Sequence, residues 1–210
     1  RRTSVVLIVL DNLRRDRLSL YGYPRQTTPR LDAWSKRALV FDHAVATSGW
    51  TLPSHASMFT GLYPSSHGAH AYASELDQTN TYVLRQDVRT LAEVARDAGV
   101  STGAVVANHL FLSPDFGIDQ GFTDYQLLRP RPGLRLKRLD DAVLNHDRYG
   151  YTAIDWPYVR GAFVTDLATR WLAAHDDEPH FLFVNYMDVH LPNDQPGNDV
   201  VPFDDEMIVP

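Results

Sequence analysis

The chain has 210 residues, which is long enough for one substantial α/β domain, and its 44% of hydrophobic residues suffices for a full core. A net charge of −6 argues against a nucleic-acid-binding surface over the whole domain, and the lack of cysteine excludes disulfides, thiolate metal sites and cysteine nucleophiles. No stretch approaches the roughly 18 apolar residues of a membrane span. These features leave the cellular compartment open.

The first elements can be predicted from apolar runs and helix-start signals. The valine-rich run Ser4–Leu10 predicts a central parallel strand that is covered on both faces. A helix is expected over Thr28–Ala38, with Thr28 as cap and Pro29 as first helical residue. Val40–Ala46 is compatible with a short strand.

The segment Trp50–Gly61 has the pattern of a helix that begins beside a hydroxyl group. Thr51 is expected to be the N-cap, Pro53 falls in the first turn, and Gly61 stands where the helix would end. An anionic ester group can bind at the positive end of such a helix. Thr51 is therefore either an ordinary cap or a nucleophile.

The second half of the chain alternates helices and strands. Helices are expected over Arg89–Ala98, with Gly99 as stop, and over Tyr158–His175; buried strands are expected over Thr102–Ala107 and His180–Met187. This alternation predicts an α/β fold with a mainly parallel (mixed) sheet and helices on both faces. The basic stretch Arg129–Arg138 is interpreted as a solvated surface loop, with an anion-binding patch as the alternative.

Polar residues follow each of the three expected buried strands. Asp11 follows the first strand, Asn108 and His109 follow the second, and Asp188 and His190 follow the third. Because ligands of parallel sheets bind at the carboxyl ends of the strands, these side chains are expected to share one edge of the sheet.

Asp11 and Asn12 are candidate metal ligands, because carboxylate and amide oxygens suit Ca²⁺ or Mg²⁺. The alternative is an Asx turn that ends the strand. An unassisted hydroxyl is a poor nucleophile near neutral pH, and a cation shared by Asp11 and Thr51 would activate it. The sequence therefore predicts a metal site at Asp11, Asn12 and Thr51.

Several histidines have more than one interpretation. His55 lies one turn after Thr51 and is either a contact to the same anion or a surface helix residue. His67 is expected to order a turn, and His190 is expected to protonate a leaving group or to hold an ester oxygen. Asn108 and His109 are candidates for substrate binding, with loop capping as the alternative.

The order of motifs along the chain resembles the N-terminal part of the sulfatase family, within the alkaline phosphatase superfamily. The matching stretches cover nearly the whole chain: Val6–Asn12, Tyr21–Tyr23, Thr28–Asp32, Trp50–Gly61, Tyr63–Gly68, Asp97–Gly103, Phe116–Phe122 and Tyr186–Pro192.

The resemblance implies an alkaline-phosphatase-like fold and a metal-dependent hydrolase of sulfate or phosphate esters. It places the metal at Asp11 and Asn12, the nucleophile at Thr51 and the histidine that contacts the substrate anion at His190. Threonine stands where sulfatases have the cysteine or serine that becomes formylglycine, and His55 stands where the motif has arginine. Threonine nucleophiles are familiar in the phosphodiesterases and phosphoethanolamine transferases of the superfamily.

We therefore expect residues 1–210 to form one incomplete catalytic domain, the N-terminal portion of a longer one. The expected activity is hydrolysis of small-molecule sulfate, phosphate or phosphonate esters through Thr51, with Ca²⁺ favoured and Mg²⁺, Mn²⁺ or Zn²⁺ as alternatives. The alternative functions are a phospho-group transferase and an inactive sulfatase-like domain. No nucleic-acid partner is expected.

Overall fold

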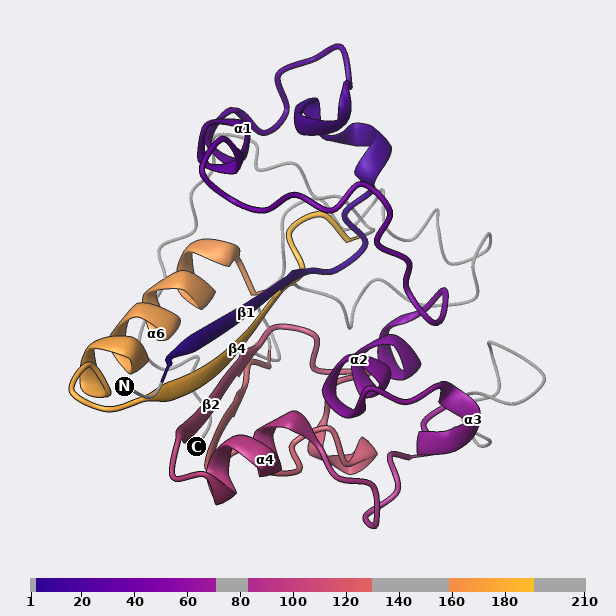
Figure 1. Ribbon diagram of the computed structural model, residues 1–210, viewed down its shortest axis with the longest axis vertical. Coiled ribbons are helices and arrows are strands. Elements are labelled where there is room, and N and C mark those ends of the chain that lie inside the picture. Colours follow the sequence, from indigo (N-terminus) through magenta and orange to yellow (C-terminus); the bar gives the residue numbers. More distant parts are fainter. Residues whose placement is uncertain (1–2, 71–82, 130–158, 191–210) are drawn as a thin grey trace, which may run out of the picture.

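The computed structural model describes residues 3–70, 83–129 and 159–190 (Figure 1). The described strands form one parallel sheet in the order β1-β4-β2-β3. Its members are β1 (Val5–Leu10), β2 (Ser101–Val106), β3 (Asp124–Leu127) and β4 (His180–Tyr186). Since all four strands run the same way, their carboxyl ends meet at one edge of the sheet, as the sequence predicts.

Helices lie on both sides of this sheet. Figure 1 shows α6 on one side of the strands and α2 and α4 on the other. The helical segments are η1 (Arg15–Arg17), η2 (Ser19–Tyr21), α1 (Pro29–Ser35), α2 (Thr51–Thr60), α3 (Pro64–His67), α4 (Leu91–Asp97), η4 (Pro114–Phe116) and α6 (Gly161–Ala174). No helix in the described ranges is both long and apolar enough to span a membrane.

The core on the α6 side depends on one close approach between helix and sheet. Phe163, Leu167 and Trp171 of α6 pack against alternate residues of β2 and β4. A Cβ atom at Gly103 of β2 would lie 2.3 Å from the ring of Trp171, so glycine makes room for the indole. The helix expected over Tyr158–His175 is observed as α6, which begins at Gly161 and ends at Ala174.

The core on the α2 side is built around Phe183 of β4. The ring of Phe59 in α2 meets Phe183 edge to face with centroids 4.9 Å apart, and Phe122 lies next to both rings. Such edge-to-face pairs are favoured by the quadrupoles of the rings. These contacts fix α2 along the sheet, with its first turn at the carboxyl edge.

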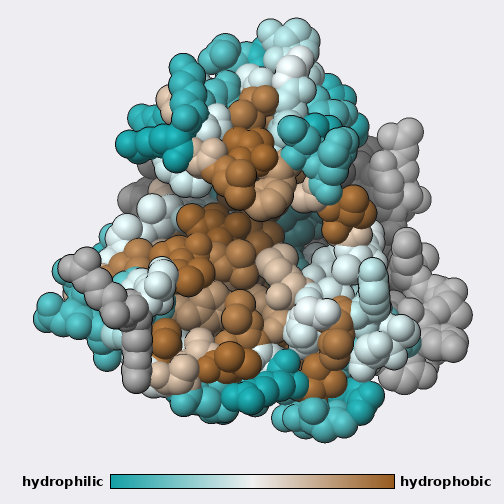
Figure 2. Space-filling view, in the orientation of Figure 1, coloured by the Kyte–Doolittle hydropathy of each residue, from teal (hydrophilic) through white to brown (hydrophobic). Residues whose placement is uncertain are grey.

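Within the described residues, the strand β1 does not have the central, doubly covered position that its sequence predicts. It pairs with β4 along one edge, and no described strand pairs with its other edge. Val6 and Ile8 are 42% and 57% exposed, and Figure 2 shows a hydrophobic area in the part of this face where Figure 1 places β1. A continuous apolar run indicates that both faces of a strand favour burial. It does not indicate which other segments of the protein cover those faces.

Three further expectations need correction. Residues 40–46 form no strand, and Phe41 and Val45 are exposed. The side chain of Thr28 does not cap α1 but donates to the carboxylate of Asp32 at 2.9 Å, and the helix ends at Ser35. The helix expected over Arg89–Ala98 is shorter, because Thr90 caps α4, which begins at Leu91 and ends at Asp97.

Two further strand predictions are confirmed, and two other segments cannot be compared with the structure. The strands near Thr102–Ala107 and His180–Met187 are confirmed within one residue at their ends. Residues 130–138 of the basic loop, and the segment from Leu191 onward, lie outside the described residues.

His67 joins α2 to α3, and its chemistry is set by two neighbours. The imidazole is fully buried, and its Nδ1 accepts a hydrogen bond from the backbone N–H of Ala69 at 3.1 Å. The proton is therefore on Nε2, which lies 3.0 Å from the hydroxyl of Ser57 and donates to it. Burial lowers the pKa of His67 below its ordinary value.

We predict that the free energy of unfolding falls as pH drops below about 6.5, the ordinary histidine pKa. Below that pH the unfolded chain binds a proton at position 67 that the folded chain does not accept. Burial also lowers the pKa of His55, which adds a contribution of the same sign. Urea unfolding between pH 8 and pH 5 measures this slope.

The control compares two histidine substitutions. His67→Gln should make the decline shallower, whereas His43→Gln, at an exposed position, should leave it unchanged. Equal slopes in His67→Gln and the parent protein would contradict the assignment.

Candidate functional site

Three side chains from distant parts of the chain meet at the carboxyl edge of the sheet. Thr51 Oγ1 donates to Asp11 Oδ2 at 3.4 Å, and Asn108 Nδ2 donates to the same oxygen at 3.0 Å. Asn108 Nδ2 also lies 3.5 Å from Thr51 Oγ1. The three residues are 9% exposed or less, so these polar groups face one another in a sheltered place.

Thr51 differs from the predicted N-cap in a way that matters chemically. Trp50, with extended backbone, is the N-cap of α2, and Thr51 is the first helical residue. The Thr51 hydroxyl is therefore not used to satisfy a helix N–H group, and it is directed to Asp11 instead. The edge-to-face contact of Trp50 with Phe111, at 5.2 Å, holds the helix start against the turn that follows β2.

Asn108 is fixed at both ends of its side chain and at its backbone. Its Oδ1 accepts from the N–H of Phe111 at 3.1 Å, while its own N–H donates to Asn185 Oδ1 at 2.9 Å. Its carbonyl accepts from the N–H of Leu112 at 3.2 Å. The structure thus contains the loop capping that was one of the two interpretations of Asn108, and its role in substrate binding stays a prediction.

Asn12 lies next to Asp11 but in a different environment. It is exposed and has a φ of 64°, the only positive φ of a non-glycine residue in the described ranges. Asparagine tolerates this left-handed conformation, which here ends β1 in a turn closed by the N–H of Leu13 and the carbonyl of Leu10. The structure thus ends β1 in a turn closed by backbone groups, with no side-chain bond of an Asx turn among the described residues, and the metal role of Asn12 stays a prediction.

The donor set at this edge is compatible with a hard divalent cation. Asp11 Oδ1 forms no hydrogen bond within the described part of the chain, and Asn12 and Thr51 add an amide and a hydroxyl oxygen. Oxygen ligands of this kind suit Ca²⁺ or Mg²⁺, which take six or more of them. Three residues cannot complete such a shell, and the described residues contain no group of three or more acidic or histidine side chains that could hold a metal.

His55 is not the surface residue that was one of its two interpretations. It is 3% exposed, and its ring packs against Phe183 with centroids 5.8 Å apart. Its Nδ1 lies 2.8 Å from the carbonyl of Thr51, and because a carbonyl only accepts, Nδ1 carries the proton. Burial lowers the pKa of His55, so a neutral ring supports the backbone of Thr51.

The residues after β4 are held by the first turn of α6. Asp188 Oδ1 accepts from the N–H of Gly161 at 2.8 Å, and a Cβ at position 161 would lie 2.6 Å from the other carboxylate oxygen. The N–H of His190 donates to the Met187 carbonyl at 3.0 Å, which closes a turn at the same edge as Asp11. The half-buried His109 is also at this edge, where burial lowers its pKa.

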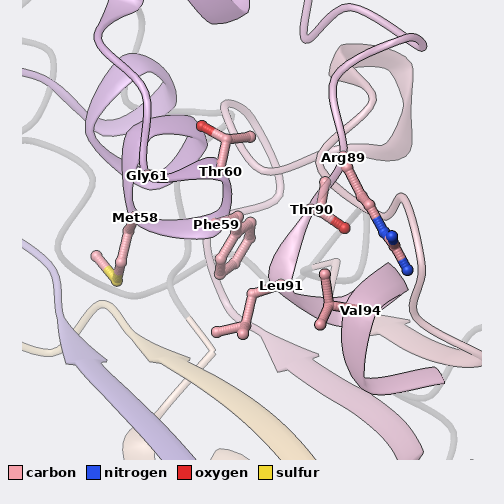
Figure 3. Close-up of a pocket in the computed structure, with 8 residues that line it drawn as sticks. All are labelled: Met58, Phe59, Thr60, Gly61, Arg89, Thr90, Leu91 and Val94. Atoms are coloured by element: carbon pink, nitrogen blue, oxygen red, sulfur yellow. The ribbon is translucent and has the colours of Figure 1, made fainter. Parts of the chain in front are cut away.

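A separate groove lies at the other end of α2 (Figure 3). It has a volume of about 270 Å³ and is lined by Met58, Phe59, Thr60, Gly61, Arg89, Thr90, Leu91 and Val94. Thr51 begins the ten-residue helix and the groove lies beside the last turn of the same helix. Thr51 and the groove are therefore about 14 Å apart along the helix axis. The groove is not part of the candidate site.

One functional candidate was missed in the sequence. Asn185 follows the wholly apolar run Phe181–Val184 in β4 and is 0% exposed. An amide residue directly after an apolar run is the sequence signal that could have found it. Burying an amide is costly unless it forms a hydrogen bond, so its presence there indicates that the bond is required.

Comparison with known proteins identifies the family. The model of the family described as Sulfatase matches residues 3–205. An N-acetylgalactosamine-6-O-sulfatase of Bacteroides thetaiotaomicron is 24% identical over 91% of this chain and 49% of its own length. A human N-sulphoglucosamine sulphohydrolase is 25% identical over 81% of this chain and 28% of its own length.

Solved structures agree on the fold. The phosphonate monoester hydrolase of Agrobacterium radiobacter superimposes with a TM-score of 0.63 at 22% identity, over 91% of this chain and 42% of that protein. The chain spans about half the length, or less, of these relatives. The parallel sheet with helices on both sides is the alkaline-phosphatase-like arrangement of sulfatases. Since the family model covers nearly all of the 210 residues, the chain belongs to the sulfatase family.

Proposed function

We propose that this chain carries the nucleophile of a metal-dependent hydrolase of sulfate, phosphate or phosphonate esters, with Thr51 as the attacking residue. The observation that carries the proposal is the shared carboxylate oxygen: Asp11 Oδ2 accepts from both Thr51 and Asn108. These three residues come from separate elements, and a purely structural cap on α2 would not need the other two. Membership of the sulfatase family supports the reaction class.

In the first step, Thr51 Oγ attacks the sulfur or phosphorus of the ester and gives up its proton. Asp11 Oδ2 accepts that proton; the two oxygens are 3.4 Å apart, a length that is common in active sites without substrate. The Asn108 amide orients both oxygens. The positive end of the α2 dipole favours the anionic group of the substrate.

The bond from sulfur or phosphorus to the leaving oxygen then breaks. His190, at the same edge of the sheet, supplies the proton that the leaving alcohol needs. Water then attacks the sulfur or phosphorus and gives one proton to His190; the bond to Thr51 Oγ breaks, the inorganic anion leaves, and the proton held by Asp11 restores the threonine hydroxyl. Asn108 and His109 are the proposed contacts to the bound anion, and His55 supports the attacking residue through its carbonyl.

A divalent cation, with Ca²⁺ favoured and Mg²⁺, Mn²⁺ or Zn²⁺ as alternatives, would be held by Asp11, Asn12 and Thr51. Bound there, it would lower the pKa of the hydroxyl and offset charge on the ester oxygens. The neutral His55 makes this contribution more important, because the motif arginine would bring a permanent charge that a neutral imidazole lacks.

Two observations bear on the substrate. The relatives named N-acetylgalactosamine-6-O-sulfatase and N-sulphoglucosamine sulphohydrolase support sulfated sugars, with an O-sulfate ester in the first name and an N-sulfo group in the second. Threonine at position 51, which is not a formylglycine precursor, favours phosphate or phosphonate esters, and the fold shared with a phosphonate monoester hydrolase is compatible with them. A panel of sugar sulfates, aryl sulfates, phosphate esters and phosphonates distinguishes the classes.

We predict that Thr51→Ala lowers kcat by about 10³-fold or more, because no other group replaces the attacking oxygen. Thr51→Ser keeps the hydroxyl and should stay within about tenfold of the parent protein. Since the Thr51 side chain does not cap α2, both variants should retain the thermal stability of the parent within a few degrees.

The matched control is Thr60→Ala, which removes a hydroxyl from the last turn of the same helix. It should leave kcat unchanged. Full activity in Thr51→Ala would contradict the proposal. Product release only in the presence of an alcohol acceptor would favour a transferase, and inactivity of the complete protein on every ester would favour an inactive domain.

Removal of metal is predicted to abolish turnover. Dialysis against EDTA should lower activity at least 100-fold, and one of the four cations should restore it. Asp11→Asn should weaken that cation's binding, as followed by metal content and titration calorimetry, whereas Asp176→Asn, at an exposed position, should not. Full activity in a metal-free preparation would overturn the metal assignment.

A further inference from the structure

We propose that Asn185 is a positioning residue, which holds Asn108 so that its amide keeps the Thr51 hydroxyl and the Asp11 carboxylate together. This inference rests on the proposed function of Thr51. Asn185 touches none of the proposed reacting atoms; it acts through the backbone of Asn108.

The position of Asn185 in the sheet makes this role geometrically direct. It is paired with Val9 of β1 on one side and with Val106 of β2 on the other. Asp11 and Asn108 follow these two neighbouring strands. The side chain of Asn185 thus lies on the strand between the two that deliver the site, just before they end.

Two hydrogen bonds join Asn185 to the start of the turn after β2. Its backbone carbonyl accepts from the N–H of Ala107 at 3.2 Å, and its side-chain Oδ1 accepts from the N–H of Asn108 at 2.9 Å. The side chain therefore extends the ladder between β2 and β4 by one residue. This extra bond sets the direction in which the chain leaves β2 and the position of the Asn108 amide.

The Nδ2 atom of the Asn185 amide indicates that a contribution to stability alone does not account for an asparagine at this position. Its Nδ2 is buried and has no hydrogen-bond partner among the described residues. An unsatisfied buried donor lowers the stability of the folded protein. At a purely structural position directly after the apolar run Phe181–Val184, an apolar side chain would avoid this cost, so the amide is consistent with a requirement for the Oδ1 acceptor.

The consequence is a chain of three fixed links. Asn185 holds the Asn108 backbone, the N–H of Phe111 holds the Asn108 side-chain oxygen, and the Asn108 Nδ2 is left to donate to Asp11 and Thr51. If the first link is removed, the turn gains freedom, and the hydroxyl and carboxylate lose their common partner. A displacement of about 1 Å at a reacting group can cost 100-fold in rate.

The experiment uses Asn185→Ala and the similarly shaped Asn185→Leu, the second so that a cavity is not confused with the loss of the acceptor. Both should lower kcat by about 10- to 100-fold with KM changed less than about threefold. In an Asn108→Ala background, the additional change at position 185 should lower kcat less than twofold, because the residue through which it acts is already gone.

Thr102→Val is the matched control. Thr102 is also a fully buried polar residue of the sheet, and its hydroxyl donates to the Gly121 carbonyl at 2.8 Å. The substitution should lower stability without changing kcat. If Thr102→Val lowers kcat as much as the two changes at position 185, the effect reports stability and the positioning role is overturned.

Amide hydrogen exchange measured without substrate separates this inference from the proposed function. In both Asn185 variants, the N–H groups of Asn108 and Phe111 should exchange at least tenfold faster, while those of β4 should not. Unchanged exchange at Asn108 would overturn the positioning role whatever the activity. Faster exchange in a protein that cleaves no ester would support the positioning of Asn108 and contradict the proposed function alone.

Discussion

The parallel pairing of β4 between β1 and β2 is the constraint on which the rest of the structure depends. Because the three strands run the same way, the residues that follow them arrive at one edge of the sheet. Asp11 and Asn108, which are 97 positions apart in the sequence, come within hydrogen-bond distance there. The core on both sides of the sheet serves this arrangement by fixing the strands in register.

The helix α2 supplies the third member of the site, and the way it begins is important. A threonine used as N-cap would spend its hydroxyl on a backbone N–H group. With Trp50 in that position, the Thr51 hydroxyl is available to Asp11, and the aromatic contacts of Trp50 and Phe59 hold both ends of the helix in place. One turn later in the same helix, the neutral His55 donates a hydrogen bond from Nδ1 to the Thr51 carbonyl.

Two buried polar residues next to the candidate site each carry a side-chain atom without a hydrogen-bond partner. Asn185 and His55 each have one buried atom that lacks a partner in the described structure, Nδ2 and Nε2, and both residues support a member of the site. Groups of this kind cost stability. Three further atoms of this kind lie elsewhere in the described structure, so an unsatisfied atom is informative here only together with the hydrogen bonds to Thr51 and Asn108.

Sequence patterns alone predicted β1, β2 and β4, the long helices and the residues that follow these strands, because hydrophobic periodicity and turn residues are local properties; they did not predict the short strand β3. They also identified the family, through motifs that occur in order along the chain. Tertiary structure decided that β1 lies at the edge of the described sheet, that residues 40–46 form no strand, and that Thr51 is the first helical residue. It alone showed that Asn108 shares an oxygen of Asp11 with Thr51 and that Asn185 holds Asn108. The reason is that these outcomes depend on which distant segments meet, and a local pattern carries no information about its partner.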